Sequence, residues 1–284
     1  MVGCYGNEPE ISAKLCAAEP GTLVAMADFV TATDRGSVRW LTMSNPGRMN
    51  AIPPTAWSDL ADVFNDFEES GARVLVIRGA DGHFCSGADM NRDFADVPSA
   101  ADNAARMRRT NAAAVALHRL SKPTIAAVDG VAVGAGMNLA LGCDIVVASE
   151  RARFAEIFVK RGLTVDFGGT WLLPRLVGLA RARELALTGR VVNADEALDM
   201  GLVCEVVPAD SLETRVSEIA LDLSAGAPLA QSMIKRAMDR SSSMTFEQAL
   251  SFEEQSQAIL LGSEDLAEGA AAFVEKRPPE FKGL

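Results

Sequence analysis

The feature that most constrains the fold is the stretch 127–144, where a short apolar run leads through closely spaced glycines into a helical pattern. The apolar run, residues 124–128, predicts a buried strand. The glycines that allow a sharp turn after it are Gly130, Gly134 and Gly136. A helix beginning near Ala135 would present unpaired amides at its start. The stretch therefore predicts a site for an anion, or for an oxygen that becomes one.

Two other interpretations of these glycines are a close strand-to-helix packing contact and a dinucleotide-binding fingerprint. The packing interpretation stays open from this stretch alone. The fingerprint requires a third glycine where this chain has Leu139, whose side chain would obstruct close packing of helix and strand. We therefore reject a dinucleotide site here.

Composition narrows the class of protein. With 49% hydrophobic and 23% charged residues over 284 positions, the chain is expected to fold as one large domain or as a core with a helical appendage. Its net charge of -11 argues against nucleic acid or an anionic membrane as main partner. Five scattered cysteines without a C-x-x-C spacing and only two histidines predict neither disulfides nor a metal site. We expect a cytoplasmic protein without a membrane-inserted segment.

The order of apolar runs and helical patterns predicts an α/β architecture. Residues 1–27 show no periodicity and are expected to be a flexible extension, 28–209 an α/β core, and 210–284 a helical region. Within the core we expect a hairpin over 29–43, strands at 74–78, 124–128 and 144–148, and a helix over 180–187. The helices expected at the C-terminal end span 210–225, 228–240, 245–261 and 264–274.

A second loop of small residues follows the expected strand at 74–78. It contains Ser86, Gly87 and Ala88, and it resembles the glycine stretch in placing small side chains directly after a strand. Backbone amides in both loops can therefore approach a ligand closely. Together the two loops could direct two amides at one oxygen.

Several short motifs, in this order and spacing, carry a family resemblance. They are Asn45-Pro46 with Asn50-Ala51, residues 84–89, residues 129–136, Cys143-Asp144-Ile145, residues 168–175 and residues 275–281. With these motifs the chain resembles the crotonase superfamily, also called the enoyl-CoA hydratase/isomerase family, over about residues 28–284.

The resemblance implies a spiral of ββα units, with C-terminal helices that assemble homotrimers or dimers of trimers. It also implies a coenzyme A thioester as ligand, so that coenzyme A is part of the substrate and no prosthetic group is expected. By match to the motifs, the backbone amides of Ala88 and Ala135 would form an oxyanion hole for the thioester carbonyl.

The resemblance also locates the acid–base positions. Hydratases of the family carry two glutamates, and Asn138 and Phe158 stand at the matching positions here, so neither can carry a proton. Asp166 matches the aspartate of several isomerase branches, and its apolar neighbours would favour its protonated form. The alternative role for Asp166 is to cap a helix that starts near Gly169.

Three further residues belong to the candidate site as possible substrate-orienting groups. Asn138 could orient substrate or water through its amide, and Phe158 could line the acyl pocket or belong to the core. Glu156 is the competing carboxylate, although we expect it to be solvated or ion-paired.

By the resemblance, the motif Asn45-Pro46 with Asn50-Ala51 matches the early loop of the family, and residues 84–89 and 129–136 match its first and second oxyanion loops. The CoA contacts implied by the resemblance lie along these three loops. The residues expected there are Arg48, Ala51, Ser86, Ala88, Asp89, Met90 and Gly134. Lys276, Arg277 and Lys282 near the end of the chain are further possible partners of the CoA phosphates, although charges at a tail are usually solvated.

The reaction favoured by one proton carrier is the shift of a double bond, because the same carboxylate can remove a proton from one carbon and return it to another. Hydration of a 2-enoyl thioester is the second candidate, since it needs water activation as well as protonation. A CoA-ester-binding protein with little turnover is the third. Thioester hydrolysis is the fourth, but Ser86 has no evident base near it in the sequence.

Overall fold

The computed structural model describes residues 21–90 and 99–284. The strands are β1 (Thr22–Met26), β2 (Val30–Arg35), β3 (Val38–Met43), β4 (Val74–Gly79), β5 (Thr124–Val128), β6 (Val131–Val133), β7 (Ile145–Ser149), β8 (Arg153–Ala155), β9 (Val192–Asn193) and β10 (Glu205–Val207). The α-helices are α1 (Ala56–Glu69), α2 (Ala100–Arg119), α3 (Ala135–Leu141), α4 (Gly169–Val177), α5 (Leu179–Thr188), α6 (Ala194–Asp199), α7 (Leu212–Ala225), α8 (Pro228–Ser241), α9 (Phe246–Leu260) and α10 (Glu264–Glu275). Two short 3-10 helices, η1 (Ile157–Arg161) and η2 (Ala209–Ser211), complete the set.

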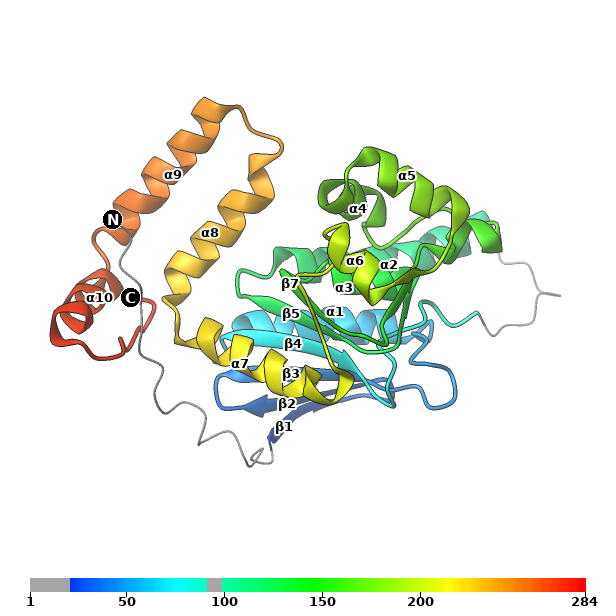
Figure 1. Cartoon of the computed structure of the whole chain (residues 1–284), viewed down its shortest axis with the longest axis horizontal. Coiled ribbons are helices and arrows are strands. Elements are labelled where there is room, and N and C mark those ends of the chain that lie inside the picture. Colours follow the sequence, from blue (N-terminus) through cyan, green and yellow to red (C-terminus); the bar gives the residue numbers. More distant parts are fainter. Residues whose placement is uncertain (1–20, 91–98) are drawn as a thin grey trace.

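The main sheet has seven strands in the order β1-β2-β3-β4-β5-β7-β10. The first three strands pair antiparallel, and the remaining pairs from β3 to β10 are parallel. A second sheet has the order β6-β8-β9. The α/β class predicted from the sequence is confirmed, because helices cover both faces of a mainly parallel sheet (Figure 1).

The central strands are apolar without interruption because both faces of the sheet are buried. Successive side chains of a strand point to opposite faces, so Val74 and Val76 of β4 lie on one face and Leu75 and Ile77 on the other. The first pair packs in a cluster with α7, and the second in the cluster that contains α1 and α3. The two clusters hold the sheet between its helices and fix the strand ends where the loops of the site begin.

Trp40 of β3 connects α7 to the sheet. Its ring is 2% exposed and lies between two guanidinium groups, 4.6 Å from Arg35 and 5.0 Å from Arg78. Glu213 of α7 accepts a hydrogen bond from each arginine, at 2.7 and 2.8 Å. This cation–π arrangement keeps α7 across the sheet.

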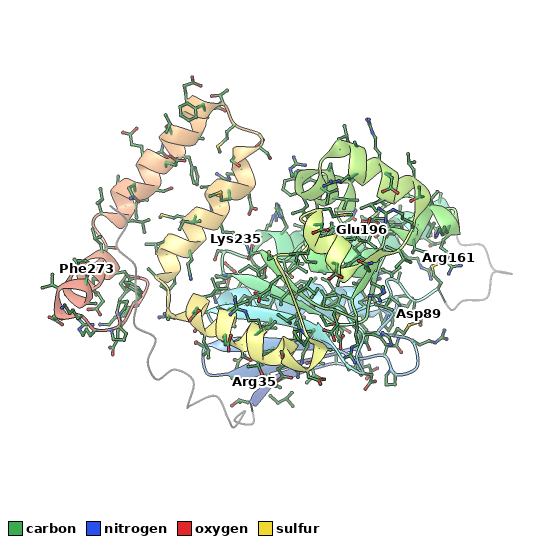
Figure 2. All side chains as sticks on the ribbon, in the orientation of Figure 1. Arg35, Asp89, Arg161, Glu196, Lys235 and Phe273 are labelled. Atoms are coloured by element: carbon green, nitrogen blue, oxygen red, sulfur yellow. The ribbon has the colours of Figure 1, made fainter. Side chains whose placement is uncertain are left out.

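The C-terminal helices α8, α9 and α10 extend away from the sheet (Figure 1). Lys235 of α8 returns toward the core, where it donates to Asp144 at 2.7 Å and to the Lys122 carbonyl at 3.1 Å (Figure 2). Large apolar side chains remain exposed on these helices, among them Phe246 (74%) and Phe273 (81%). The four C-terminal helices predicted from the sequence are present, with bounds within about two residues.

One expectation about the start of the chain needs correction. Residues 22–26 were expected to lie in a flexible extension, yet they form β1, which pairs antiparallel with β2. The strand is specified by its pairing with the outer edge of β2, which its own residue pattern does not show. Residues 1–20 lie outside the described part of the chain. Within that part, no helix is both long and apolar enough to cross a bilayer.

Candidate active site

The two loops of small residues are joined by backbone hydrogen bonds. The Cys85 amide donates to the Val131 carbonyl at 2.8 Å, and the Val133 amide donates to the Cys85 carbonyl at 2.9 Å. Cys85 thereby pairs with Ala132 of β6 as in a parallel sheet. The loop that follows β4 and the turn that precedes α3 are consequently one structural unit.

Two glycines make this contact possible. A Cβ on Gly136 would lie 2.3 Å from the Cys85 carbonyl oxygen, and a Cβ on Gly87 would lie 2.8 Å from the Val133 carbonyl oxygen. Both distances are too short for any side chain, and Gly87 also has a φ of +93°. The same Cβ on Gly87 would be 3.6 Å from the Ala135 amide nitrogen, so the two loops meet at the start of α3.

The amides of Ala88 and Ala135 are available to a ligand. Neither donates a hydrogen bond to any group within residues 21–90 and 99–284. Ala88 is exposed, whereas Ala135 is only 2% exposed. Ala135 is the first residue of α3, where amides have no partner within the helix, so its N–H is a candidate donor to a ligand. The structure thus brings together the two loops that the sequence analysis singled out.

A polar cluster lies beside the second loop. Asn138 of α3 is fully buried, and its Nδ2 donates to the main-chain carbonyl of Asp166 at 3.0 Å and to Glu156 Oε2 at 3.5 Å. Glu156 lies between β8 and η1, and Asp166 lies in the loop before α4. One amide therefore connects the two carboxylic residues of the candidate site.

Burial changes the acidity of both carboxyl groups. It raises the pKa of Glu156 to about 7, and although the hydrogen bond from Asn138 lowers that pKa, the nearby charge of Asp166 raises it further. Burial also raises the pKa of Asp166 to about 6. Desolvation disfavours the charged form, as the apolar neighbours of Asp166 predicted. Both groups therefore titrate close to neutral pH, where a proton carrier is most effective.

The expectation for Glu156 was wrong. Its side chain is neither solvated nor ion-paired within the described residues, because it is 1% exposed and its only hydrogen-bond partner is Asn138. The sequence carried no local signal for this burial, because the three-residue strand β8 ends at Ala155 and Glu156 is the residue that leads from it into η1.

The alternative role of Asp166 as a helix cap is excluded. The residue before α4 is Gly168, and no side chain caps that helix. Asp166 contributes only its main-chain carbonyl, which accepts from the Gly169 amide at 3.0 Å. Its Oδ1 has no hydrogen-bond partner. The carboxylate is therefore free to act on a ligand.

Phe158 and Phe167 supply apolar walls to the site. Phe158 is 6% exposed, and its ring would lie 3.6 Å from a Cβ on Gly134 in the second loop. Phe167, next to Asp166, packs against Trp57 with 5.7 Å between ring centroids. Phe158 thus belongs to the core and lines the second loop at the same time.

The early loop is attached to the first oxyanion loop. Ser86 Oγ donates to the Arg48 carbonyl at 2.9 Å, and the Ile52 amide donates to the Gly87 carbonyl at 2.8 Å. Asn50 is buried and donates to the Ala80 and His83 carbonyls, which explains the asparagine of the early motif. Asn50 was recognised as part of a motif, but this structural role was not predicted from the sequence.

The residues expected to contact CoA fall into two groups. Arg48, Ala88 and Met90 are exposed, whereas Ala51 is buried and Asp89 is partly buried. Arg277 is separate from them, since its guanidinium is bound to Glu268 in α10 at 2.5 and 2.9 Å. The arginine near the end of the chain is thus already paired.

A cavity of about 410 Å³ borders the loop that carries Asp166. Its lining residues come from α2, α3, α4 and the loop: Asn111, Ala114, Val115, Leu117, His118, Gly142, Phe167, Gly168, Trp171 and Leu172. His118 packs edge-on against Trp171, with ring centroids 5.2 Å apart, as a packing residue should. No sequence motif indicated this cavity, because its walls come from segments distant in the chain.

Comparison with known proteins adds independent findings. The family model for enoyl-CoA hydratase/isomerase matches residues 33–284. The 1,2-epoxyphenylacetyl-CoA isomerase of Escherichia coli K12 is 36% identical over 261 residues, which cover 91% of this chain and 100% of that protein. The 2,3-dehydroadipyl-CoA hydratase of the same organism is 36% identical over 248 residues, covering 86% and 94%. An isomerase and a hydratase thus share the same percentage identity with this chain, the isomerase over a somewhat longer stretch.

The fold agrees with the same family. The crystal structure of an enoyl-CoA hydratase from Bacillus anthracis aligns with a TM-score of 0.86 at 30% identity, covering 90% of this chain and 100% of that chain. That of an enoyl-CoA hydratase from Polaromonas sp. JS666 aligns with a TM-score of 0.84 at 34% identity, covering 89% and 99%.

Proposed function

Because the chain belongs to the enoyl-CoA hydratase/isomerase (crotonase) family, we propose that it shifts a carbon–carbon double bond in an enoyl-CoA thioester. The observation that carries the proposal is the combination of two unpaired amides, on Ala88 and Ala135, with a buried carboxyl group on Asp166. The amides suit an oxygen that gains negative charge. The carboxyl group suits the movement of one proton.

The two amides polarise the substrate. They donate to the thioester carbonyl oxygen and stabilise the enolate more than the ground-state carbonyl, because the charge on that oxygen grows along the reaction. A donor of this kind contributes about 3–4 kcal/mol to lowering the barrier. The glycines at positions 87 and 136 keep the donors fixed, so little reorganisation is needed during the reaction.

Asp166 moves the proton. As a carboxylate it takes a proton from C4 of a 2-enoyl thioester, or from C2 of the 3-enoyl isomer, and the dienolate forms in either case. It then returns the proton to the other carbon. Substrate and product therefore have the same atoms and the same number of electrons, and Asp166 ends the reaction as the carboxylate that began it. Asn138 holds the main chain of Asp166 through its bond to the carbonyl.

Hydration of a 2-enoyl-CoA is the second candidate. The observation in its favour is Glu156, a second carboxyl group, which is buried and accepts a hydrogen bond from Asn138, the residue that also donates to the main-chain carbonyl of Asp166. Two carboxyl groups can activate water and deliver a proton more readily than one. The positions that match the glutamates of hydratases nevertheless hold Asn138 and Phe158, which favours isomerisation.

Substrate contacts follow from the loops. We place the CoA portion along Arg48, Ala51, Ser86, Asp89 and Met90, with Gly134 beside the thioester. The distal part of the acyl group enters the cavity next to Phe167 and Gly168, whose walls include Trp171 and Val115.

We also propose an assembly and a location for the protein. The exposed apolar residues of α8, α9 and α10 are consistent with a homotrimer or a dimer of trimers. A cytoplasmic location fits the buried free thiols of Cys85 and Cys143.

The decisive experiment uses matched 2-enoyl-CoA and 3-enoyl-CoA esters in deuterated water, with mass spectrometry as the readout, on the wild type and the Asp166→Asn variant. Migration of the double bond without gain of water, lost in the variant, supports isomerisation by Asp166. Asp199→Asn, an exposed change on α6, is the matched control. Water addition that survives in Asp166→Asn contradicts the proposal and favours hydration. Acyl-CoA binding without turnover indicates a binding protein, and release of free CoA indicates hydrolysis.

A further inference from the structure

Three buried oxygen atoms around Asn138 have no hydrogen-bond partner within the described residues. They are Asn138 Oδ1, Glu156 Oε1 and Asp166 Oδ1. All three are acceptors when both carboxyl groups are ionised, and the only N–H donors of the cluster are those of the Asn138 amide, both already directed at other oxygens. The cluster therefore lacks a donor.

Within the described residues, Asp166 is the one charged group that affects the pKa of Glu156. The hydrogen bond from Asn138 and the charge of Asp166 are the only side-chain influences on the Glu156 carboxyl. The elements in contact with β8 and η1 do carry charges, but several of these are paired elsewhere: Glu184 and Glu196 with Arg190, and Arg153 with the Glu150 and Ala152 carbonyls. The other charged residues of these segments are Lys160, Arg161, Arg181, Arg183, Asp195 and Asp199.

Among residues 21–90 and 99–284, no cation compensates a negative charge on Glu156. A buried carboxylate is stable only with an ion-pair partner or several donors, and Glu156 has one hydrogen bond at 3.5 Å. A carboxylic acid at this position needs no counter-charge, and its O–H supplies the donor that the cluster lacks. Asp166 is less buried than Glu156, so it loses less solvation when it is charged and is the member of the pair that ionises first.

We propose that Glu156 is a positioning residue that is protonated in the active form of the site, donates within the Asn138 cluster, and so keeps Asp166 as the single carboxylate of the site. This inference rests on the proposed function and adds a residue outside the family's glutamate positions. During the reaction the proton of Glu156 stays in place. Only the proton taken by Asp166 from one substrate carbon is returned to the other.

The charge state has a direct consequence for catalysis. If Glu156 loses its proton, a second negative charge stands beside Asp166 in a site where the substrate oxygen also becomes negative. Like charges in a buried site repel strongly, so the active form requires one carboxylate and one carboxylic acid. Activity should then depend on two ionisations with opposite effects.

The first test is an infrared titration of the substrate-free protein, because a buried carboxylic acid has a C=O stretch that a carboxylate lacks. We expect this band in the wild type at pH 6.5, fading with a midpoint of about 7. Glu156→Gln should lack the component with the midpoint of about 7 and keep only a minor component from Asp166, which fades with a midpoint of about 6. Asp166→Asn should retain the Glu156 component with a lower midpoint, because the neighbouring charge is gone. Absence of the component with the midpoint of about 7 in the wild type, or its persistence in Glu156→Gln, overturns the proposal.

The second test is the pH profile of kcat for double-bond migration. In the wild type, activity should rise through about pH 6 as Asp166 ionises and fall above about pH 7 as Glu156 ionises. Glu156→Gln keeps a neutral donor, so kcat at pH 6.5 should fall by about three- to tenfold, the worth of one hydrogen bond, while the fall above pH 7 disappears. A profile with the same two limbs in the variant contradicts the proposal, because a purely structural role would leave the limbs unchanged.

The two proposals fail separately. If no enoyl-CoA shows double-bond migration, the proposed reaction is wrong, yet the infrared titration still reports the protonation of Glu156. If migration is observed but the band is missing, the reaction stands and Glu156 is an ionised residue. Should Glu156→Gln fold poorly, the midpoint shift between wild type and Asp166→Asn decides the question with Glu156 intact.

Discussion

The two halves of the candidate site are built on different principles. The oxyanion loops offer backbone amides, which any residue possesses, and their geometry depends on glycines that no other residue can replace. The Asn138 cluster offers side chains, and their chemistry depends on how much water the surrounding fold removes. The first half is therefore specified locally by residue type, and the second by residues distant in the chain.

The two halves of the site therefore differ in how well they can be predicted from the sequence. A glycine that packs closely against a neighbouring backbone, as Gly87 and Gly136 do, belongs to a motif of small residues that is visible in the sequence. A carboxyl group leaves no such trace, because Glu156 would look the same on an exposed helix. Mutations should show the same contrast: steric changes in the loops, and electrostatic changes in the cluster.

The largest expected effect comes from adding one methyl group to the loops. Gly136→Ala places a Cβ 2.3 Å from the Cys85 carbonyl oxygen, so the two loops must separate and the Ala135 amide moves off its target. We expect kcat/KM to fall by about 10²–10³, the loss typical of one oxyanion donor. The control is Gly71→Ala, where nothing lies within 4 Å of the new Cβ. Equal activity of the two variants would show that the loops tolerate the additional methyl group without displacing the Ala135 amide.

The next largest effect is on stability, and it comes from Glu156 in the Asn138 cluster. Burial raises the pKa of Glu156 from 4.5 to about 7, so between these values the native protein binds more protons than the unfolded chain. The free energy of unfolding therefore decreases as the pH rises through this window, by about 3 kcal/mol in total.

Glu156→Gln removes this dependence. Relative to the wild type, the variant should gain up to about 3 kcal/mol at pH 8 and nothing from this source at pH 4, as measured by urea unfolding. Glu69→Gln, at an exposed position on α1, should leave the slope unchanged. A wild-type curve that is flat from pH 4.5 to 7 would mean that Glu156 is not desolvated.

The smallest effect is expected at the exposed surface beside the site, where neither close glycine packing nor burial of a carboxyl group is involved. Arg48 is exposed beside the first oxyanion loop, and Arg48→Ala should raise KM for the CoA ester by about three- to tenfold with little change in kcat, since one charged contact to substrate is lost in ground and transition states alike. Arg277→Ala is the comparison, because that guanidinium is already bound to Glu268. A larger rise in KM from Arg277→Ala would place the CoA phosphates at the end of the chain.

Long elements with a clear period were predictable from the sequence. The hairpin, the buried strands β4, β5 and β7, and the C-terminal helices all follow from apolar patterns and glycine or proline boundaries. The strands β6, β8 and β9 were not predicted, because two or three residues are too short to show a period. β1 was missed for a related reason, since its pairing partner and not its own pattern specifies it.

The candidate site divides in the same way. The positions of Ala88, Ala135 and Asp166 followed from motifs and from a family resemblance, and the structure brings the two loops together. The burial of Glu156 and its connection to Asp166 through Asn138 did not follow, because they depend on how β8 packs in the folded core.

The distribution of aromatic rings has a practical consequence. The chain has three tryptophans, and each lies in a different region: Trp40 between two arginines under α7, Trp57 against Phe167 beside Asp166, and Trp171 in the wall of the cavity, with the Arg175 guanidinium 3.8 Å from its ring. Fluorescence from single-tryptophan variants can therefore separate docking of α7, occupancy near the carboxylate and filling of the acyl cavity, without an added label.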